Sequence, residues 1–304
     1  MNTSRLTVIV VNFNGGPIVR QCLDHLWPQM RDGWEAVLVD NASGDGSADG
    51  LERSFPGLSV VRNRENVGFA RANNQAIEQT DGDYVLLLNP DVVVAPGALA
   101  AAIEFLEDTP DVSILGPKIL LPDGRLDPAA HRSFKTPATY LYRVTGLSRL
   151  FPRHRSFGRY YLSYLDEDAI ADVDSVVGAF LLIRRSVIDR IGLLDERFFM
   201  YCEDEDWCWR AKAAGGRVVY HPGIVVHHRK GSSARTVPFR MAYHWHRSLY
   251  LYHRKNIAPR YAGATNLTVY AGIAVAFAAR IGVLAVQRVL AAPRHHARSA
   301  PASR

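Results

Sequence analysis

The stretch LTVIVVNFNG, residues 6–15, is a short apolar run that ends in Asn and Gly. WEAVLVDNASGDGS (34–47) and DYVLLLNPDVVV (83–94) repeat this pattern. Runs that are apolar throughout, rather than at alternate positions, are typical of strands covered on both faces, as in a parallel sheet. Helical candidates lie between them at 16–30 and 68–79. The repeated order of strand, polar turn and helix predicts an α/β unit over the first 115 residues.

The polar ends of these strands are candidates for ligand binding, because ligands of such sheets bind at the carboxyl ends of the strands. Asn12, Asp40, Asn41, Asn89 and Asp91 stand there. A carboxylate such as Asp91 suits Mg²⁺ or Mn²⁺, which bridge to substrate phosphates, although a simple Asn-Pro-Asp turn explains the same residues. Neither G-x-G-x-x-G after the first strand nor G-x-x-x-x-G-K-[ST] occurs, so a dinucleotide fold and a P-loop are not predicted.

The middle of the chain changes character. Residues 117–172 are rich in Pro, Arg and Tyr, as expected of a loop or helical insertion over an active site. A strand at 176–183 and a short helix are predicted next, followed by FMYCEDEDWCWR (199–210). This last stretch sets four consecutive carboxylates among aromatic residues, where we expect a raised pKa for a carboxyl that acts as a base. A helix is predicted at 204–214, with two glycines after it.

Composition limits the compartment and the class of protein. The chain has 304 residues and can bury a sizeable core. Its three cysteines, Cys22, Cys202 and Cys208, form no metal-ligand spacing and leave an odd count, which argues against a disulfide framework and structural zinc. The apolar N-terminal segment lacks a basic leader and a small-residue cleavage site, and it is typical of a buried strand. We therefore expect a cytoplasmic protein.

The last third of the chain is basic. The 98 residues after Asp206 contain 16 Lys and Arg and no Asp or Glu. Such a block favours polyanions: nucleic acid, anionic lipid headgroups or a pyrophosphate-bearing substrate. Residues 261–279 are uncharged, which is near the lower limit for a membrane-spanning helix. Arg280, Gln287 and Arg288 fall on one helical face, which favours a helix lying in the membrane interface over a spanning or a soluble packing helix.

Seven segments together resemble one family. Each is weakly specific by itself, but their order along most of residues 6–233 is highly specific. The chain resembles a family 2 glycosyltransferase of the GT-A fold, in particular the bacterial rhamnosyltransferase-like branch that builds cell-surface polysaccharide and lipid-linked glycans. The segments are VIVVNFNG, VDNASGDGS, NVGFARANNQAI, LLLNPDVVV, VVGAFLLIRRSV, GLLDERFFMYCEDEDWCWRAKAAGG and HPGIVVHHRKGSS.

The resemblance implies a fold and a domain organisation. The fold class is α/β of the GT-A type, a Rossmann-like nucleotide-diphospho-sugar transferase fold with a mixed, mostly parallel sheet flanked by helices. Residues 1–235 would form the glycosyltransferase domain, with a nucleotide-sugar-binding half (1–115) and an acceptor and catalytic half (116–235). Residues 236–304 would form a basic, helical, membrane-associating extension.

The resemblance also implies roles for particular residues. Asp91, in the place of the DxD motif, would hold Mg²⁺ or Mn²⁺, and His228 fits the second metal ligand better than His227. Asp204 would be the catalytic base, with Glu203 as its partner. The nucleotide-sugar site would contain Asn12, Asp40, Asn41, Arg71 and Asn89.

The implied activity is inverting, metal-dependent transfer of a sugar from a nucleotide diphospho-sugar to a lipid-linked or polysaccharide acceptor at the cytoplasmic face of the membrane. A dTDP-sugar, with rhamnose first, or a UDP-sugar is the expected donor, and no nucleic acid is expected to bind. Ser175 and Val177 stand where the family often has an aromatic residue, which leaves the acceptor open. The alternatives are a sugar-phosphate nucleotidyltransferase, or a basic membrane- or nucleic-acid-binding protein with an inactive glycosyltransferase fold.

Overall fold

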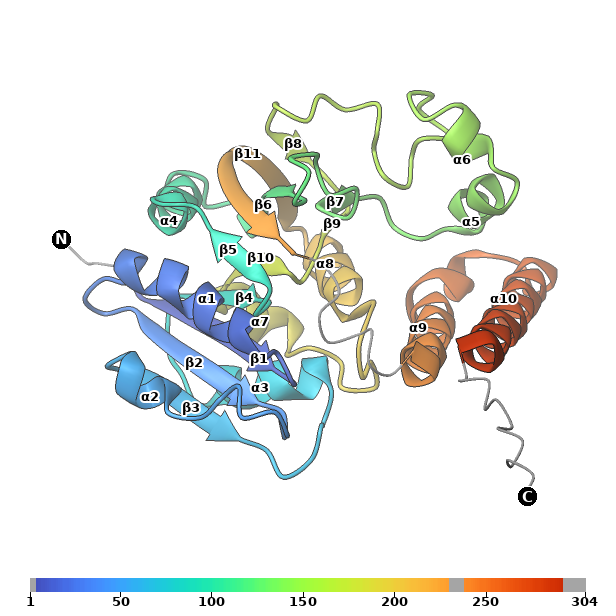
Figure 1. Ribbon diagram of the computed structural model, residues 1–304. Coiled ribbons are helices and arrows are strands. Elements are labelled where there is room, and N and C mark those ends of the chain that lie inside the picture. The colour runs from blue at the N-terminus through green and yellow to red at the C-terminus, as the bar shows by residue number, and fades with distance from the viewer. Residues whose placement is uncertain (1–3, 230–237, 292–304) are drawn as a thin grey trace, which may run out of the picture.

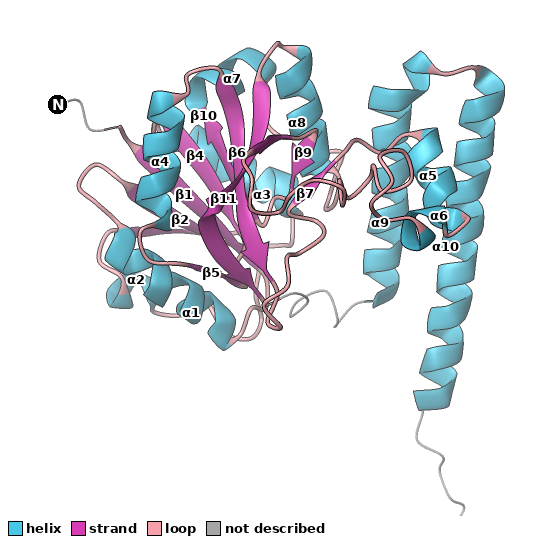
Figure 2. Ribbon diagram, turned by 90° about the horizontal axis from the view of Figure 1, so that it is seen from above, coloured by secondary structure: helices cyan, strands magenta, loops and turns pink. Residues whose placement is uncertain are grey.

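The computed structural model describes residues 4–229 and 238–291 (Figure 1). An α/β body contains the sheet, and a pair of helices, α9 and α10, lies beside it (Figure 2). The predicted domain boundary between 235 and 236 lies outside the described residues.

The body is built on a mixed nine-stranded sheet of order β3-β2-β1-β4-β10-β6-β11-β5, with β8 paired to β11. β1 is parallel to both β2 and β4, and β10 is antiparallel to β4 and β6. A separate ribbon is formed by β7 and β9. The strands are β1 (Leu6–Asn12), β2 (Glu35–Asp40), β3 (Leu58–Arg62), β4 (Tyr84–Leu88), β5 (Val92–Val94), β6 (Val112–Leu120), β7 (His131–Arg132), β8 (Ala171–Asp172), β9 (Ser175–Val176), β10 (Phe180–Arg184) and β11 (Arg217–His228).

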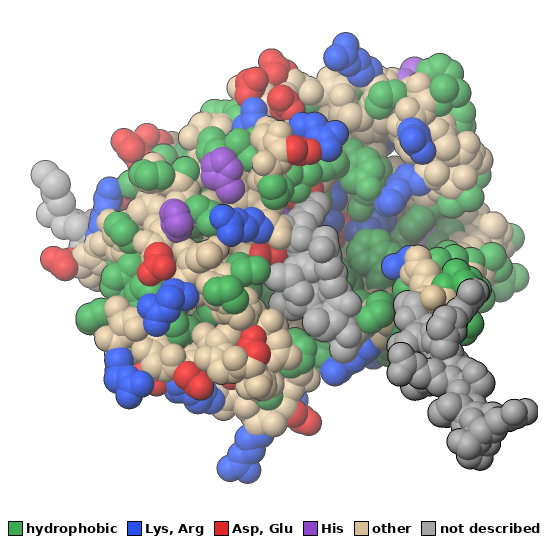
Figure 3. Space-filling model, viewed as in Figure 1, with side chains coloured by type: hydrophobic (Ala, Val, Ile, Leu, Met, Phe, Trp, Pro, Cys, Tyr) green, Lys and Arg blue, Asp and Glu red, His purple; other side chains and the backbone are tan. Residues whose placement is uncertain are grey.

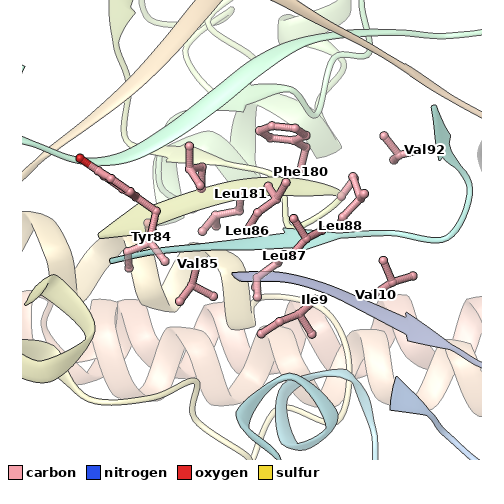
Figure 4. Close-up of a cluster of buried hydrophobic side chains, with 14 of the residues drawn as sticks. Ile9, Val10, Tyr84, Val85, Leu86, Leu87, Leu88, Val92, Phe180 and Leu181 are labelled. Carbon is pink, nitrogen blue, oxygen red and sulfur yellow. The ribbon is translucent and has the colours of Figure 1, made fainter. Parts of the chain in front are cut away.

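Helices cover both faces of the sheet (Figure 2). The central strands are buried throughout because side chains from both of their faces enter apolar layers, as β1 and β4 show (Figure 4). The prediction of continuous apolar strands is therefore confirmed. The helices of the body are α1 (Pro17–Leu26), α2 (Leu51–Ser54), α3 (Phe69–Glu78), α4 (Ala98–Asp108), α7 (Arg185–Ile191) and α8 (Glu203–Ala213), with a 3₁₀ turn at Trp27–Gln29.

One predicted strand is wrong. The apolar run at 176–183 divides into β9 and β10, because Ser175 and Val176 pair with β7 whereas Phe180 onward pairs with β4. Gly178 lies at the break, and a Cβ there would meet Asp204 and Phe69 at 3.5 and 3.6 Å. The break brings the backbone of this segment to the carboxylate cluster.

Residues beyond the body form an arm and a hairpin. The predicted helical insertion contains α5 (Pro137–Val144) and α6 (Leu147–Leu150). The hairpin consists of α9 (Pro238–Tyr252), a π-helical turn (His253–Ile257), a 3₁₀ turn (Ala258–Arg260) and α10 (Gly263–Ala291). Within the described residues, α10 is the one helix that is long and apolar enough to cross a membrane. Only 6% of its most apolar 18-residue stretch is buried.

Candidate active site

Asn12 and Asp40 meet at the carboxyl ends of β1 and β2, as predicted. They are paired in the sheet register, and Asn12 Nδ2 donates to Asp40 Oδ1 at 3.0 Å. The same amide group donates to the hydroxyls of Ser43 and Ser47, while Asn12 Oδ1 is buried without a hydrogen-bond partner among the described residues. The loop after β2 is thereby held against the end of β1.

Asn41 is buried and fully hydrogen-bonded, whereas Arg71 is exposed. Both ends of the Asn41 amide are used: Oδ1 accepts from Asn63 Nδ2 and Val67 N, and Nδ2 donates to Asn66 Oδ1. Asn41 is buried and fixes the loop before α3. Arg71 is exposed, and its Nε lies 3.9 Å from Glu196 Oε2. In the described part of the chain it forms no hydrogen bond to Asn12 or Asp40.

The Asn-Pro-Asp turn after β4 contacts the end of β11. His228 Nε2 lies 3.1 Å from Asp91 Oδ1, and His228 Nδ1 lies 3.5 Å from Asp127 Oδ2. Burial disfavours the imidazolium, but hydrogen bonds to Asp127 and Asp91 outweigh it and raise the pKa of His228 to about 9. His227 is exposed. Of the two adjacent histidines, His228 is the one that the fold brings to Asp91.

A strained turn presents the carboxylates. Tyr201 and Cys202 have φ angles of 73° and 66°, which residues with a side chain rarely adopt. Directly after them α8 begins at Glu203, so that four acidic side chains form its first turn. Such strain persists where the surrounding structure holds it, as it often does at functional sites.

Asp204 differs from the prediction. Its Oδ2 accepts from Arg132 Nη2 at 2.8 Å and from Gly178 N at 3.0 Å, and its Oδ1 accepts from Glu205 N at 2.7 Å. Burial alone would raise the pKa of Asp204, but Arg132, then Lys135 and the two amides, hold it below its usual value. The predicted rise is therefore wrong for this residue, because the apolar sequence neighbours conceal an ion pair formed from a distant segment.

The raised pKa belongs to Glu203. Burial, and then the adjacent charge of Asp204, raise the pKa of the Glu203 carboxyl to about 8. Its Oε2 is buried with no hydrogen-bond partner among the described residues. At neutral pH the pair therefore consists of an ionised Asp204 beside a protonated Glu203.

The other two acids of the first turn are buried structural ions. Glu205 accepts a hydrogen bond from the backbone N of Lys135 and forms an ion pair with its ammonium. Asp206 lies 2.9 Å from Arg210 Nε and 2.8 Å from Lys255 Nζ. Both lie in the first turn of α8, where the helix dipole favours negative charge, and specific cations also neutralise them.

Sequence reasoning missed Arg132 and Lys135 as members of this site. The available signal is their position at the start of a stretch, residues 128–165, that contains seven Lys and Arg but no Asp or Glu. Several cations of the basic last third turn toward carboxylates of the body, so only part of its positive charge is available to a polyanion. Lys255 pairs with Asp195 and Asp206, and Arg217 pairs with Asp111 and Asp172.

Two hydrogen bonds donated by backbone amides join the two ends of the site. Asn89 N donates to Ala179 O at 2.9 Å, and Gly178 N donates to Asp204 Oδ2. The Asn-Pro-Asp turn and the carboxylate pair are thus connected through residues 178–179, which directly precede β10.

The aromatic residues of 199–210 pack against the hairpin and the core. Phe199 stacks on His244 with ring centroids 4.1 Å apart, and Tyr201 packs on Trp245. Trp207 is fully buried. These rings therefore join α9 to the edge of the site.

Comparison with known proteins identifies the family. The model of the family "Glycosyl transferase family 2" matches residues 7–192. The chain belongs to glycosyl transferase family 2. The predicted family is confirmed, and the enzyme is a glycosyltransferase of the rhamnosyltransferase-like kind.

Two curated relatives indicate the branch. The transferase is 30% identical over 273 residues, 86% of each chain, to N-acetylglucosaminyl-diphospho-decaprenol L-rhamnosyltransferase of Mycobacterium tuberculosis. It is 28% identical over 198 residues to rhamnosyltransferase WbbL of Escherichia coli, which covers 59% of the transferase and 67% of that protein. These relatives support a role in glycan biosynthesis.

A solved structure supports the predicted fold class. The mannosyltransferase PcManGT of Pyrobaculum calidifontis, in complex with GDP-Man and Mn²⁺, superposes with a TM-score of 0.57 at 22% identity. The match covers 96% of the transferase and 82% of the other chain. Together with the family match and the mixed sheet, it confirms the GT-A fold.

Proposed function

We propose that the transferase moves a sugar, with rhamnose as the first candidate, from a nucleotide diphospho-sugar to a lipid-linked or polysaccharide acceptor, with inversion at the anomeric carbon. The observation that carries this proposal is the connection of Asp91 and His228 to Asp204 and Glu203 through the backbone of residues 178–179. One end suits a donor diphosphate, and the other offers a carboxylate to an attacking hydroxyl.

The donor end fits a divalent cation in part. Asp91 and His228 supply one carboxylate oxygen and one imidazole nitrogen, and no cluster of three or more His, Cys, Asp or Glu ligands occurs among residues 4–229 and 238–291. A cation bound through two side chains takes its other ligands from water and substrate phosphates. The carboxylates of Asp91 and Asp127 on either side of His228 attract positive charge to this position, and the imidazole would release its proton when it binds a cation. When bound there, Mg²⁺ or Mn²⁺ would neutralise the leaving diphosphate, and the nitrogen ligand suits Mn²⁺ well.

The nucleotide end would use Asp40 and Asn12. Asp40 lies at the end of β2, where a carboxylate can accept hydrogen bonds from a ribose or a base. Asn12 holds it in place, Asn41 shapes the neighbouring loop, and Asn89 anchors the turn that carries Asp91. Arg71 stays a proposed contact at the exposed end of α3. Donors with dTDP or UDP are the first candidates.

Asp204 is the proposed general base because it is the member of the pair that stays ionised at neutral pH. It would take the proton of the acceptor hydroxyl as that oxygen attacks the anomeric carbon. The guanidinium of Arg132 would hold the carboxylate in position. Glu203, protonated at neutral pH, avoids two adjacent buried charges.

A lipid-linked acceptor is supported by the name of the mycobacterial relative, which specifies a diphospho-decaprenol carrier. It also agrees with α10, an exposed apolar helix next to the body. The transferase would therefore work at the cytoplasmic face of the membrane, in contact with it through the basic C-terminal region.

The substitution Asp204→Asn tests the assignment of the base. Loss of a general base lowers the rate by about 10²–10⁴-fold. We expect that loss in kcat, measured by release of nucleoside diphosphate, with donor affinity little changed in calorimetry. Asp108→Asn, an exposed carboxylate of α4, is the control and should keep full activity. A kcat of Asp204→Asn equal to that of the wild type would exclude this role.

A further inference from the structure

The arm, which we define as residues 137–155, exposes four large apolar side chains. The exposed fractions are 57% for Leu141, 86% for Val144, 70% for Leu150 and 47% for Phe151. Leu141 and Val144 stand three residues apart and therefore share one face of α5. A soluble helix normally directs such a face to the core, so this orientation calls for a partner.

One edge of this face packs against the hairpin through Tyr140, which stands one helical turn before Val144. Tyr140 packs on the small hydrophobic cluster of Leu249 and Tyr252 in the hairpin, against which Ile273 of α10 also packs. A cavity of about 630 Å³ lies between the arm and residues 156–174, with Tyr142 of the arm and Tyr261 of the hairpin among its lining residues. The arm is therefore fixed beside the hairpin, as Figures 1 and 2 both show.

The charge of the arm is uniformly positive. Four exposed arginines, Arg143, Arg149, Arg153 and Arg155, stand within it, and residues 128–165 contain no Asp or Glu. In the part of the chain that the structure describes, none of the four forms an ion pair with a carboxylate. Hydrophobic and basic side chains lie next to each other on the arm at the upper right of Figure 3.

Apolar side chains beside arginines that form no ion pair with a carboxylate in the described residues match the interface of an anionic bilayer, although Arg143 also lies over the rings of Tyr160 and Tyr161. Leucine, valine and phenylalanine enter the boundary between headgroups and acyl chains, while arginines bind the phosphates above it. The neighbouring α10 exposes Leu267, Val275 and Val283. Two apolar surfaces from distant parts of the sequence thus stand side by side, each with basic residues and without acidic ones.

We propose that the arm is a second membrane-binding element, which inserts Leu141, Val144, Leu150 and Phe151 into an anionic lipid surface next to α10. This goes beyond the C-terminal contact proposed above and does not depend on the identity of the donor or acceptor sugar. Two separate attachments fix the orientation of the body on the bilayer, whereas one helix would leave it free to rotate.

A fluorescent label at the arm tests the proposal on the full chain. Cys22, Cys202 and Cys208 are all buried, so a cysteine introduced by Val144→Cys reacts selectively with an environment-sensitive dye such as NBD. With vesicles of phosphatidylcholine and phosphatidylglycerol we expect a blue shift and a several-fold gain in intensity. The matched control, Glu104→Cys on α4, lies on the far side of the body and should show neither (Figure 1).

Three outcomes would overturn the proposal. They are an unchanged Val144→Cys spectrum on protein that floats with the vesicles, an equal response to pure phosphatidylcholine, and a blue shift without vesicles that grows with protein concentration. The last would mean that a second copy of the chain covers the arm.

A charge reversal tests the arginines separately. Arg149→Glu combined with Arg153→Glu should weaken binding to the anionic vesicles at least about tenfold, because each basic residue near the surface contributes substantially to attraction. Arg31→Glu combined with Arg53→Glu changes the net charge equally on exposed positions of the body, away from the arm. An equal loss of binding in both double variants would show that only net charge matters, and would also overturn the proposal.

Discussion

At the scale of single residues, Glu203 and Asp204 show how adjacent carboxyls acquire opposite properties. Both are buried, but only Asp204 is reached by a guanidinium and two backbone amides. The proton therefore resides on Glu203 at neutral pH, and the negative charge on Asp204. The residue next to the favoured base thus carries the pKa that had been expected for the base.

The state of Glu203 predicts a pH dependence of stability. Because its pKa rises from 4.5 to about 8 on folding, the native state holds more protons than the unfolded state between these values, so this residue makes stability fall as pH rises through that window. Glu203→Gln removes the effect. We expect the difference in Tm between the variant and the wild type to grow in favour of the variant from pH 5 to pH 9 in thermal scans.

The control for this prediction is Glu104→Gln, at an exposed position of α4. Its difference in Tm from the wild type should stay constant over the same pH range. A constant difference for Glu203→Gln as well would show that its carboxyl titrates normally in the folded protein.

At the scale of elements, the sequence predicted what is encoded locally. The apolar runs at 6–15, 34–47 and 83–94 became β1, β2 and β4 with β5, and the helix predicted at 204–214 is α8. Asn12, Asp40 and Asp91 are found at strand ends because parallel strands fix them there. Arg132 could not be placed, because its role depends on the pairing of β7 with β9, which is set by tertiary contacts. Its partner Asp204 stands 72 residues away.

The close contact between Gly68, directly before α3, and Phe199 predicts that a methyl group added at Gly68 lowers stability. Gly68 has φ +90°, and a Cβ there would lie 2.6 Å from the carbonyl oxygen of Phe199. Phe69 N donates to the same oxygen at 2.7 Å. We expect Gly68→Ala to lower the free energy of unfolding by roughly 2–4 kcal/mol in denaturant titrations, from the unfavourable φ and from the clash.

Gly124→Ala separates these two causes. Gly124 has φ +78°, and no atom lies within 4 Å of the place that a Cβ would take there, so its variant should lose only the conformational part, about 1–2 kcal/mol. Equal losses in the two variants would show that α3 yields to the methyl group without cost. Because Phe69 borders Gly178, we also expect Gly68→Ala to lower transfer activity.

At the scale of the whole molecule, buried ion pairs connect the last third of the chain to the body. Lys255 lies after α9 and contacts both Asp195 and Asp206, while Asn256 donates to Asp206 at 2.9 Å. The hairpin is therefore attached to the first turn of α8, which also carries the proposed base. Contact of α9 and α10 with a membrane would thus act on the first turn of α8, which carries the proposed base Asp204.

The substitution Lys255→Gln tests this attachment. It leaves Asp206 with Arg210 and Asn256, so we expect a loss of about 1–3 kcal/mol rather than the larger cost of an unpaired buried charge. The loss should appear as faster hydrogen exchange in α9, about tenfold for each 1.4 kcal/mol, while β1 and β4 stay protected. Lys118→Gln, which removes the pairs with Glu167 and Asp168 on the body, should leave exchange in α9 unchanged. If Lys255→Gln instead raised hydrogen exchange throughout the sheet, the hairpin and the body would unfold as one cooperative unit. The connection of the hairpin to α8 would then be required for folding rather than being a local attachment.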